Sequence, residues 1–254
     1  MKQTPLISII TVVYNGEQHI QQTINSIKHQ TYKNIEHIII DGNSSDGTLD
    51  IIKKNKSVSK YISEPDRGIY DAMNKGINIA SGELIGILNS DDWYELSAVE
   101  IVVNEYLRNP SKRIFHADRF DVLENGAKKK FTFNPSKFKF KYYSMTYSHP
   151  AMFIHESIYK VRKYNTSFKS ISDYEFVLKS FLTNKKLFHY INKPITNFRL
   201  GGTSGQLSFV NLLKENFQAR RNAGMTYIEC IFFLILRASG ESLRSLMGYF
   251  KNKN

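Results

Sequence analysis

The chain has few cysteines and no long apolar run, and each absence excludes a class of protein. Cys230 is the one cysteine in 254 residues, so neither an internal disulfide nor a cysteine metal cluster can form. The strongest apolar stretch, residues 231–236, is far shorter than the roughly 18 residues of a membrane span. Residues 1–5 lack the basic start and apolar core of a secretory signal. We therefore expect a cytoplasmic protein.

Motifs of two classes of binding protein are also missing. The sequence shows no zinc finger, helix-turn-helix or RNP-type aromatic motif, so nucleic acid is not favoured as a partner. Dinucleotide-binding enzymes carry Gly-x-Gly-x-x-Gly after their first strand, whereas residues 14–17 read Tyr-Asn-Gly-Glu. A dinucleotide oxidoreductase is therefore disfavoured.

Positive charge is in excess, and the excess lies in the second half of the chain. The net charge is +12. Residues 1–105 hold 9 Lys and Arg against 14 Asp and Glu, a net of −5, whereas the remainder holds 26 against 9, a net of +17. This asymmetry predicts that the second half faces an anionic partner, for which acidic lipid or a phosphorylated acceptor would qualify.

Residues 128–141 concentrate this positive charge. They include six lysines and no acid, and four phenylalanines are interleaved with them. Two interpretations stay open. The stretch is either a solvated hairpin at a sheet edge, where lysines discourage strand association, or an anion-binding surface.

Strand and helix patterns alternate through the first hundred residues. Short β-branched apolar runs predict strands, and apolar residues three and four apart predict helices. In chain order we expect a strand over 6–14, a helix burying Ile20, Ile24 and Ile27, a strand over 35–40, a helix opening at 45–48, a strand at 61–62, a helix over 68–80 burying Ile69, Ala72, Met73, Gly76 and Ile77, a C-cap at Gly82, and a strand over 83–88. This alternation predicts a mostly parallel sheet covered by helices.

The pattern is less regular after residue 105. We expect a strand over 114–117, a helix over 172–182 and a strand over 187–191. The tail ends in an amphipathic helix over 243–251 with a basic face. Such a helix either packs on the domain or lies on an anionic membrane.

Two adjacent carboxylates follow the predicted strand over 83–88. Asp91 and Asp92 stand at the carboxyl end of that strand, where open α/β sheets bind ligands. Like charges repel there unless a cation joins them, so a metal–phosphate site is one interpretation. A turn that caps the following helix is the other.

Four segments together resemble the family 2 glycosyltransferases, which are inverting enzymes of the GT-A fold. The segments are residues 7–15, 40–48, 63–76 and 89–92, and their order and spacing make the resemblance specific. The resemblance covers about residues 5–205 and looks like the branch often involved in colanic acid, capsule and O-antigen assembly. It implies an α/β nucleotide-diphospho-sugar transferase fold, with a mostly parallel central sheet flanked by helices and a C-terminal amphipathic helical appendage.

The resemblance also implies a division of the chain into three parts. Residues 1–105 form the nucleotide-sugar-binding half of the domain, and residues 106–205 form the half with the acceptor site and the catalytic base. Residues 206–254 form a basic helical segment that packs on the domain or associates with a membrane.

Donor-binding residues are implied at the ends of the predicted strands and in the loop around Arg67. The family contacts the nucleotide from these places. The matching residues here are Thr11, Val13, Tyr14, Asn15, Asp41, Arg67, Asp71, Lys75, Asn89 and Ser90. Asp41 has a turn as its structural alternative, and Asp71 has an exposed ion pair with Lys75.

A metal ligand and a base are implied in the same way. Asn89 replaces the first acid of the family's Asp-x-Asp motif, so Asp91 becomes the metal ligand and Asp92 supports it. Because the ligands are oxygens, Mn²⁺ or Mg²⁺ is expected. Asp173 falls on the position of the catalytic base, and Ser172 replaces the acid that precedes it.

A further set of residues is implied on the acceptor or phosphate side. The loop over 198–204 is glycine-rich, and glycine permits close approach of the backbone to a diphosphate. His149 has a hydrogen-bonded structural role as its alternative. Glu175, two residues after Asp173, is not assigned to the site and is expected to be a solvated surface residue. The set is His149, Arg199, Gly201 and Gly202.

The resemblance therefore predicts a metal-dependent inverting glycosyltransferase. The expected donor is a UDP-sugar, and the expected acceptor is a saccharide or a polyprenyl-diphosphate-linked glycan of a bacterial surface polysaccharide. Peripheral contact with the inner face of the plasma membrane would suit such an acceptor. Asn89 and Ser172, each in place of a family acid, leave one alternative open, a non-catalytic nucleotide- or sugar-binding module on the same fold.

Overall fold

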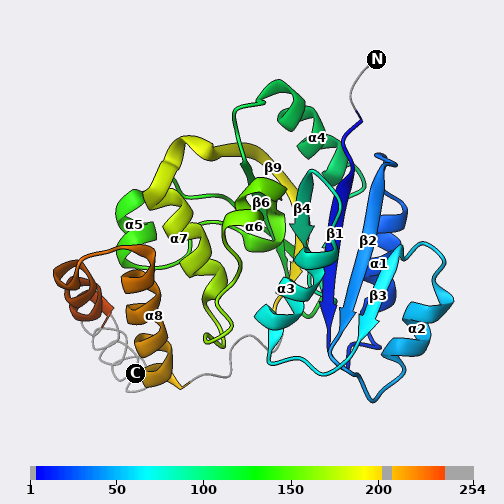
Figure 1. Ribbon diagram of the computed structural model, residues 1–254, viewed down its shortest axis with the longest axis horizontal. Helices are drawn as coiled ribbons and strands as arrows, with labels where there is room; N and C mark the ends of the chain where they lie inside the picture. The colour runs from blue at the N-terminus through cyan, green and yellow to red at the C-terminus, as the bar shows by residue number, and fades with distance from the viewer. Residues whose placement is uncertain (1–3, 202–207, 238–254) are drawn as a thin grey trace.

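The first ninety residues form the parallel part of a sheet and its covering helices (Figure 1). A computed structural model describes residues 4–201 and 208–237 of the chain. The elements of this part are β1 (Ile7–Val13), α1 (Ile20–Lys28), β2 (Ile35–Asp41), α2 (Thr48–Lys54), β3 (Lys60–Ser63), α3 (Ile69–Ile79) and β4 (Leu84–Ile87). β1 pairs in parallel with β2 and with β4, and β3 pairs in parallel with β2. The predicted alternation of strands and helices is confirmed.

The rest of the chain completes the sheet with strands of both directions. Its elements are β5 (Trp93–Tyr94), α4 (Ala98–Arg108), β6 (Ile114–Val122), β7 (Lys128–Phe131), α5 (Lys137–Tyr142), η1 (His149–Ala151), β8 (Met152–His155), α6 (Glu156–Val161), α7 (Ser172–Asn184), η2 (Lys185–Leu187), β9 (Phe188–Arg199) and α8 (Phe209–Ala223). The strand order is β3-β2-β1-β4-β8-β6-β9-β5, with β7 paired to β6. β8 is antiparallel to β4 and β6, whereas β9 is parallel to β6. The sheet is therefore parallel from β3 to β4 and mixed beyond, within the predicted α/β fold.

Burial explains why the first half folds as its sequence predicts. All seven residues of β1 are buried, as expected for a strand covered on both faces. α1 buries the three isoleucines predicted for it. α3 packs so closely on β1 that a Cβ at Gly76 would collide with Ile10. Ile69 differs from the prediction, because it is exposed at the first turn of α3.

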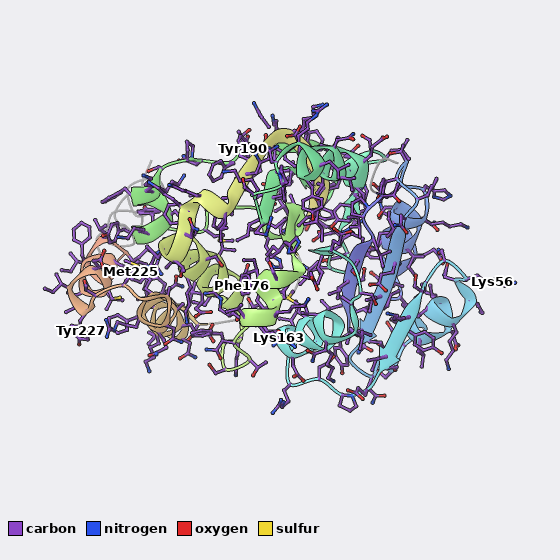
Figure 2. All side chains as sticks on the ribbon, turned by 45° about the horizontal axis from the view of Figure 1, so that its top comes forward. Lys56, Lys163, Phe176, Tyr190, Met225 and Tyr227 are labelled. Carbon is purple, nitrogen blue, oxygen red and sulfur yellow. The ribbon has the colours of Figure 1, made fainter. Side chains whose placement is uncertain are left out.

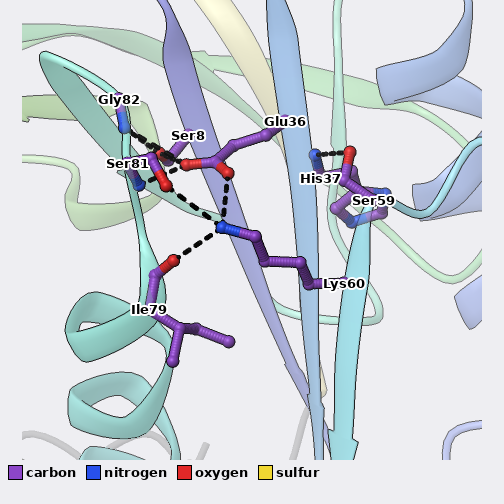
Figure 3. A network of polar contacts seen from close by, with 8 residues as sticks. All are labelled: Ser8, Glu36, His37, Ser59, Lys60, Ile79, Ser81 and Gly82. Atoms are coloured by element: carbon purple, nitrogen blue, oxygen red, sulfur yellow. Dashed lines mark hydrogen bonds and ion pairs between the residues drawn. The ribbon is translucent and has the colours of Figure 1, made fainter.

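A polar cluster joins the starts of β1 and β2 to the turn before β4 (Figure 3). The C-cap predicted at Gly82 is wrong, since the residue that caps α3 is Ala80 in an extended conformation. The Gly82 N–H instead donates to Ser8 Oγ at 2.8 Å and to Glu36 Oε1 at 3.1 Å. Lys60 Nζ pairs with Glu36 Oε2 at 3.1 Å. The cluster fixes the amino ends of the two strands.

The C-terminal helices pack against α7. α8 lies beside α7 in Figure 1, and residues 227–237 form a further helix. The buried Arg220 guanidinium of α8 lies 4.7 Å from the centre of the Tyr174 ring and 3.6 Å from that of Phe233. Arg220 therefore joins α7, α8 and the last described helix.

The structure tests only some of the predictions about the C-terminal part of the chain. Within residues 4–201 and 208–237, no helix is both long and apolar enough to cross a bilayer. The amphipathic helix expected over 243–251 lies outside the described residues. The division of the chain at residues 105 and 205 stays a prediction.

Candidate active site

A cleft of about 980 Å³ opens at the carboxyl ends of β1, β2 and β4. Parallel strands of an α/β sheet bring their carboxyl ends to one edge, where the loops leave room for a ligand. Glu124, from the β6–β7 turn, and residues 198–201 at the end of β9 also line it. Of the residues predicted at the site, the cleft brings together Val13, Tyr14, Asn15, Asn89, Ser90, Asp91, Arg199 and Gly201.

The loop after β1 is tied to the loop after β2. Asn15 adopts a positive φ of 49°, which is uncommon for a residue with a side chain. Its N–H donates to Ser44 Oγ at 2.8 Å, and its Oδ1 accepts from the Ser45 N–H at 2.9 Å. These bonds hold one wall of the cleft, from which the exposed Tyr14 ring is free to contact a ligand.

Thr11 and Asp41, two of the predicted donor-binding residues, lie beneath this wall and not on it. Both are fully buried. Thr11 Oγ1 is hydrogen-bonded to His37 Nε2 at 3.0 Å. The Asp41 carboxylate accepts from Ser63 Oγ at 2.6 Å and from the Ser44 hydroxyl and N–H. Asp41 therefore makes the turn that was its structural alternative.

The segment before α3 is held by Lys75. The Lys75 Nζ lies 2.6 Å from Asp66 Oδ1, 2.9 Å from Glu64 Oε1 and 3.9 Å from Asp71 Oδ2. The predicted pair with Asp71 is thus present, but Asp66 is the nearer partner. Asp71 Oδ2 accepts from the Arg67 N–H at 3.0 Å, while the Arg67 side chain is exposed. Asp66 reaches the cleft lining, and Lys75 and Asp71 brace the loop that carries it.

The adjacent carboxylates after β4 face different surroundings. Asp91 lines the cleft, whereas Asp92 is fully buried. Asp92 Oδ1 accepts from the Arg199 N–H at 3.0 Å, and Thr23 Oγ1 donates to the Ser90 and Asp92 carbonyls at 2.7 Å each. Burial, with Asp91 next in effect, raises the pKa of Asp92 well above its ordinary value. Of its two carboxylates, the turn therefore presents only that of Asp91 to the cleft.

The donor set in the cleft fits a hard divalent cation. Asn89, Ser90 and Asp91 supply only oxygen ligands from side chains, which suits Mg²⁺ or Mn²⁺. Among the residues that the structure describes, no group of three or more His, Cys, Asp or Glu side chains is placed to enclose a metal. Mg²⁺ commonly binds one or two carboxylates and completes its shell with water and substrate phosphates. One carboxylate here is consistent with such an open site.

Asp173 lies in the first turn of α7 and is joined to α3. The Tyr70 hydroxyl donates to Asp173 Oδ1 at 2.9 Å. Tyr70 stands between Ile69 and Ala72, which both line the cleft. Ser172 is fully buried, and its Oγ accepts from a backbone N–H, so it fixes the start of the helix. Asp173 is thus joined to a helix that lines the cleft, although it is not itself among the lining residues.

Other predicted residues divide between structural and cleft positions. His149 Nε2 is hydrogen-bonded to the Tyr164 hydroxyl at 2.8 Å, which is the structural role named as its alternative. Arg199 lies over the Trp93 ring at 5.1 Å and lines the cleft. Gly201 lines it too with a φ of 99°, and Gly202 lies outside the described residues. Glu175 is buried, so its predicted surface position is wrong.

Several residues of the site were not predicted from the sequence, among them His19, Asn43 and Tyr70. Tyr70 lies inside the 63–76 motif, so the motif itself was the signal that could have identified it. Glu124 reaches the cleft from the β6–β7 turn. No local pattern marks Glu124, because its position depends on long-range strand pairing.

The mixed sheet and its flanking helices match the GT-A fold of glycosyltransferases. Over 89% of this chain and 69% of the other, the structure is similar to Staphylococcus aureus TarS 1-349 in complex with UDP-GlcNAc, with a TM-score of 0.68 and 18% identity. It is also similar to a Pyrobaculum calidifontis mannosyltransferase in complex with GDP-Man and Mn²⁺, with a TM-score of 0.60 and 14% identity over 95% and 81% of the two chains.

Sequence comparison gives the family. Residues 8–169 match the glycosyl transferase family 2 model. The chain therefore belongs to the family 2 glycosyltransferases. It is 33% identical to an uncharacterized Mycobacterium tuberculosis glycosyltransferase over 72% of this chain and 71% of that protein. It is 28% identical to the hyaluronan synthase of Pasteurella multocida over 89% of this chain, but it spans only 24% of the synthase's length.

Proposed function

We propose that the protein is a metal-dependent inverting glycosyltransferase that uses a UDP-sugar donor and extends a bacterial surface polysaccharide such as a capsule or O-antigen. The observation that carries the proposal is the cleft, where Asp91 lies at the carboxyl end of β4 among neutral oxygen donors. UDP-GlcNAc is named with the similar TarS structure, and the hyaluronan synthase is named for a polysaccharide. Both names support a sugar nucleotide and a glycan as substrates.

The nucleotide would lie along the wall formed by the loops after β1 and β2. Val13, Tyr14 and Asn15 lie at the end of β1, and Asn43 adds a second positive φ, 65°, from the loop after β2. Tyr14 presents an aromatic face that can stack on a base. The exposed Arg67 guanidinium is able to pair with a phosphate or a carbonyl oxygen of the donor.

The diphosphate would lie against the turn after β4. Asp91, with Asn89 and Ser90 beside it, would hold Mn²⁺ or Mg²⁺, which supplies positive charge to the leaving diphosphate. Arg199 adds a fixed cation beside Asp91, since its Nε donates to the Asp91 carbonyl at 3.3 Å. Arg199 and the metal ion would therefore place positive charge where the leaving group gains negative charge.

Asp173 would act as the base. Its carboxylate takes the proton of an acceptor hydroxyl while that oxygen bonds to C1 of the sugar, and the bond from C1 to the diphosphate oxygen breaks. Attack from the face opposite the leaving group inverts the configuration at C1. Tyr70 holds the carboxylate at 2.9 Å and so fixes the direction from which the acceptor approaches.

The acceptor would be a saccharide or a polyprenyl-diphosphate-linked glycan. Residues 106–254 carry 26 Lys and Arg against 9 Asp and Glu, which favours an anionic acceptor or an anionic surface near it. Peripheral contact with the inner face of the plasma membrane belongs to the same proposal.

A thermal-shift screen of UDP-, GDP- and dTDP-sugars, with and without Mn²⁺, tests the proposal. A donor at about 100 times its Kd stabilises the folded protein by about 2.7 kcal/mol, which raises Tm by several degrees. We expect a UDP-sugar to do so in the presence of Mn²⁺, and Asp91→Asn to lose most of the Mn²⁺-dependent part.

Asp50→Asn is the matched control, because Asp50 is an exposed acid in the first turn of α2. The donor should raise the Tm of this control variant as much as it raises that of the wild type. A screen in which no nucleotide sugar raises Tm would contradict the proposal. A metal-dependent shift with a GDP- or dTDP-sugar alone would contradict the assignment of UDP.

A further inference from the structure

The helix over residues 227–237 has an inner face that is already fixed to the domain. Cys230 and Phe233 are buried, and the Phe233 ring covers the Arg220 guanidinium at 3.6 Å. Lys141 Nζ of α5 lies 2.6 Å from Glu229 Oε1. The rotation of this helix about its axis is therefore set by these contacts, and its opposite face is directed outward.

That outward face is an apolar stripe. Ile228, Ile231, Phe232 and Ile235 recur at the spacing of one helical face, and all four are exposed, Ile228 at 79% and Ile235 at 60%. The exposed Phe138 of α5 continues the surface, with its ring 6.2 Å from that of Phe232. We call these five residues the C-terminal stripe. A contiguous apolar surface of this kind marks an interaction site.

Cations border the C-terminal stripe. Lys137 and Lys139 are exposed on either side of Phe138. Glu229, an acid of the helix over residues 227–237, is paired with Lys141 and hydrogen-bonded by the Tyr142 hydroxyl at 3.0 Å. The border of the stripe therefore carries net positive charge.

This charge pattern decides which partner suits the stripe. A second copy of the chain, docked by the same face, would bring the lysines of both copies together, and like charges across an interface are unfavourable. An anionic surface offers the opposite sign to both exposed lysines of the border. An apolar helical face with cations beside it lies in the interface of an anionic bilayer.

We propose that the C-terminal stripe docks the protein on an anionic phospholipid bilayer. The isoleucines and phenylalanines enter the headgroup region, while Lys137 and Lys139 contact acidic headgroups. Figure 2 places Tyr227, at the start of this helix, at the opposite end of the molecule from Lys56, which follows α2. Docking needs no donor and no metal, so it is tested independently of the transfer reaction.

Sedimentation of the full chain with vesicles tests the proposal. The vesicles are phosphatidylcholine alone, and phosphatidylcholine with about one third phosphatidylglycerol. We expect binding to the anionic vesicles, weak or no binding to the neutral ones, and a decrease in binding as salt is raised. Failure to sediment with anionic vesicles, or equal binding to both kinds, would overturn the proposal, whatever the donor screen shows.

Variants locate the surface. Ile228→Asp combined with Ile235→Asp should lower the affinity for anionic vesicles at least tenfold. Val161→Asp, at an 88% exposed valine of α6, is the matched control and should bind as the wild type does. Lys137→Gln combined with Lys139→Gln leaves the apolar residues intact. This variant should lower the affinity for anionic vesicles roughly fivefold for each lysine removed.

The remaining outcomes are equally decisive. Equal vesicle binding by the stripe variant and by Val161→Asp would overturn the proposal. A wild-type dimer that the stripe variant converts to a monomer, measured by light scattering without vesicles, would assign the stripe to a second copy and overturn it too. Thermal melting of each variant confirms that it is folded, and the lysine variant supplies the test if the isoleucine variant is not.

Discussion

The Tyr70 hydroxyl donates a 2.9 Å hydrogen bond to Oδ1 of Asp173, and so connects α3 to the first turn of α7. Burial, with the charge of Asp173 next in effect, raises the pKa of Tyr70 well above its ordinary value. The phenol therefore stays protonated and remains a donor at physiological pH. Tyr70 acts as a positioning residue for the proposed base.

Tyr70→Phe should slow turnover without weakening donor binding. A hydrogen bond to a charged group contributes about 1.5–3 kcal/mol, so kcat should fall roughly tenfold or more while KM for the donor stays within about twofold. Tyr106→Phe is the control, because its hydroxyl also bonds a carboxylate, Glu83 at 3.2 Å, but none of its contacts is with the cleft. Equal kcat values for the two variants would contradict a positioning role for Tyr70.

Substitutions of Asp91 and of Asp92 should have different effects on the Mn²⁺ concentration that the donor needs for binding. Asp91 lines the cleft and Asp92 is fully buried beneath it. Asp91→Asn should therefore raise the half-saturating Mn²⁺ concentration at least tenfold, because it removes the charge of the proposed carboxylate ligand. Asp92→Asn should change that concentration much less. The titration follows donor binding by fluorescence or calorimetry, and a larger effect of Asp92→Asn would reverse the assignment.

Arg220→Ala should destabilise the fold. Its guanidinium is buried between two rings, with Nε donating to the Lys141 carbonyl at 2.8 Å and Nη1 to the Asn216 carbonyl at 3.0 Å. Alanine leaves a cavity and removes both bonds, so the free energy of unfolding should fall by about 3 kcal/mol. Arg221 is the next residue and is exposed, so Arg221→Ala should lower the free energy of unfolding by less than about 1 kcal/mol. Urea denaturation of both variants gives the comparison.

The pair between Glu229 and Lys141 should give a pH-dependent stability. The hydrogen bond from Lys141, above other causes, lowers the pKa of Glu229 to about 2 from an ordinary 4.5. Its contribution is therefore present above pH 4.5 and is lost as the pH falls toward 2. Glu229→Gln should lower Tm at pH 7, and the difference from wild type should shrink steadily below pH 4.5. A difference that does not change down to pH 3 would show that the ion pair does not stabilise the protein.

Local patterns were sufficient for the first half of the fold. The isoleucines of α1 and the apolar run of β1 are set by nearest neighbours and by burial on both faces, which the sequence displays directly. The error at Gly82 shows the limit of such reasoning. Gly82 does not cap the helix; Ser8, which lies 74 residues away in the sequence, approaches it so closely that there is no room for a side chain.

Long-range pairing accounts for what the sequence did not reveal in the second half. β9 runs for twelve residues because it pairs with β6 past an irregular register at Asp118, and the end of β9 then brings Phe198 and Arg199 to the cleft. The family resemblance predicted different roles for Asp91 and Asp92 but not the contact that separates them, in which the Arg199 N–H donates to the buried Asp92 while Asp91 lines the cleft. The residues next to Asp92 in the sequence do not indicate that contact.

The most direct test of the account is the comparison of donor binding with turnover in Asp173→Asn. Asparagine keeps the size of the side chain and can still accept the hydrogen bond of Tyr70, but it cannot take a proton from an acceptor hydroxyl. We expect the affinity for the UDP-sugar identified in the screen to stay within about twofold, while transfer to a saccharide acceptor falls by a factor on the order of 10²–10⁴. Transfer at the wild-type rate by this variant would contradict the account.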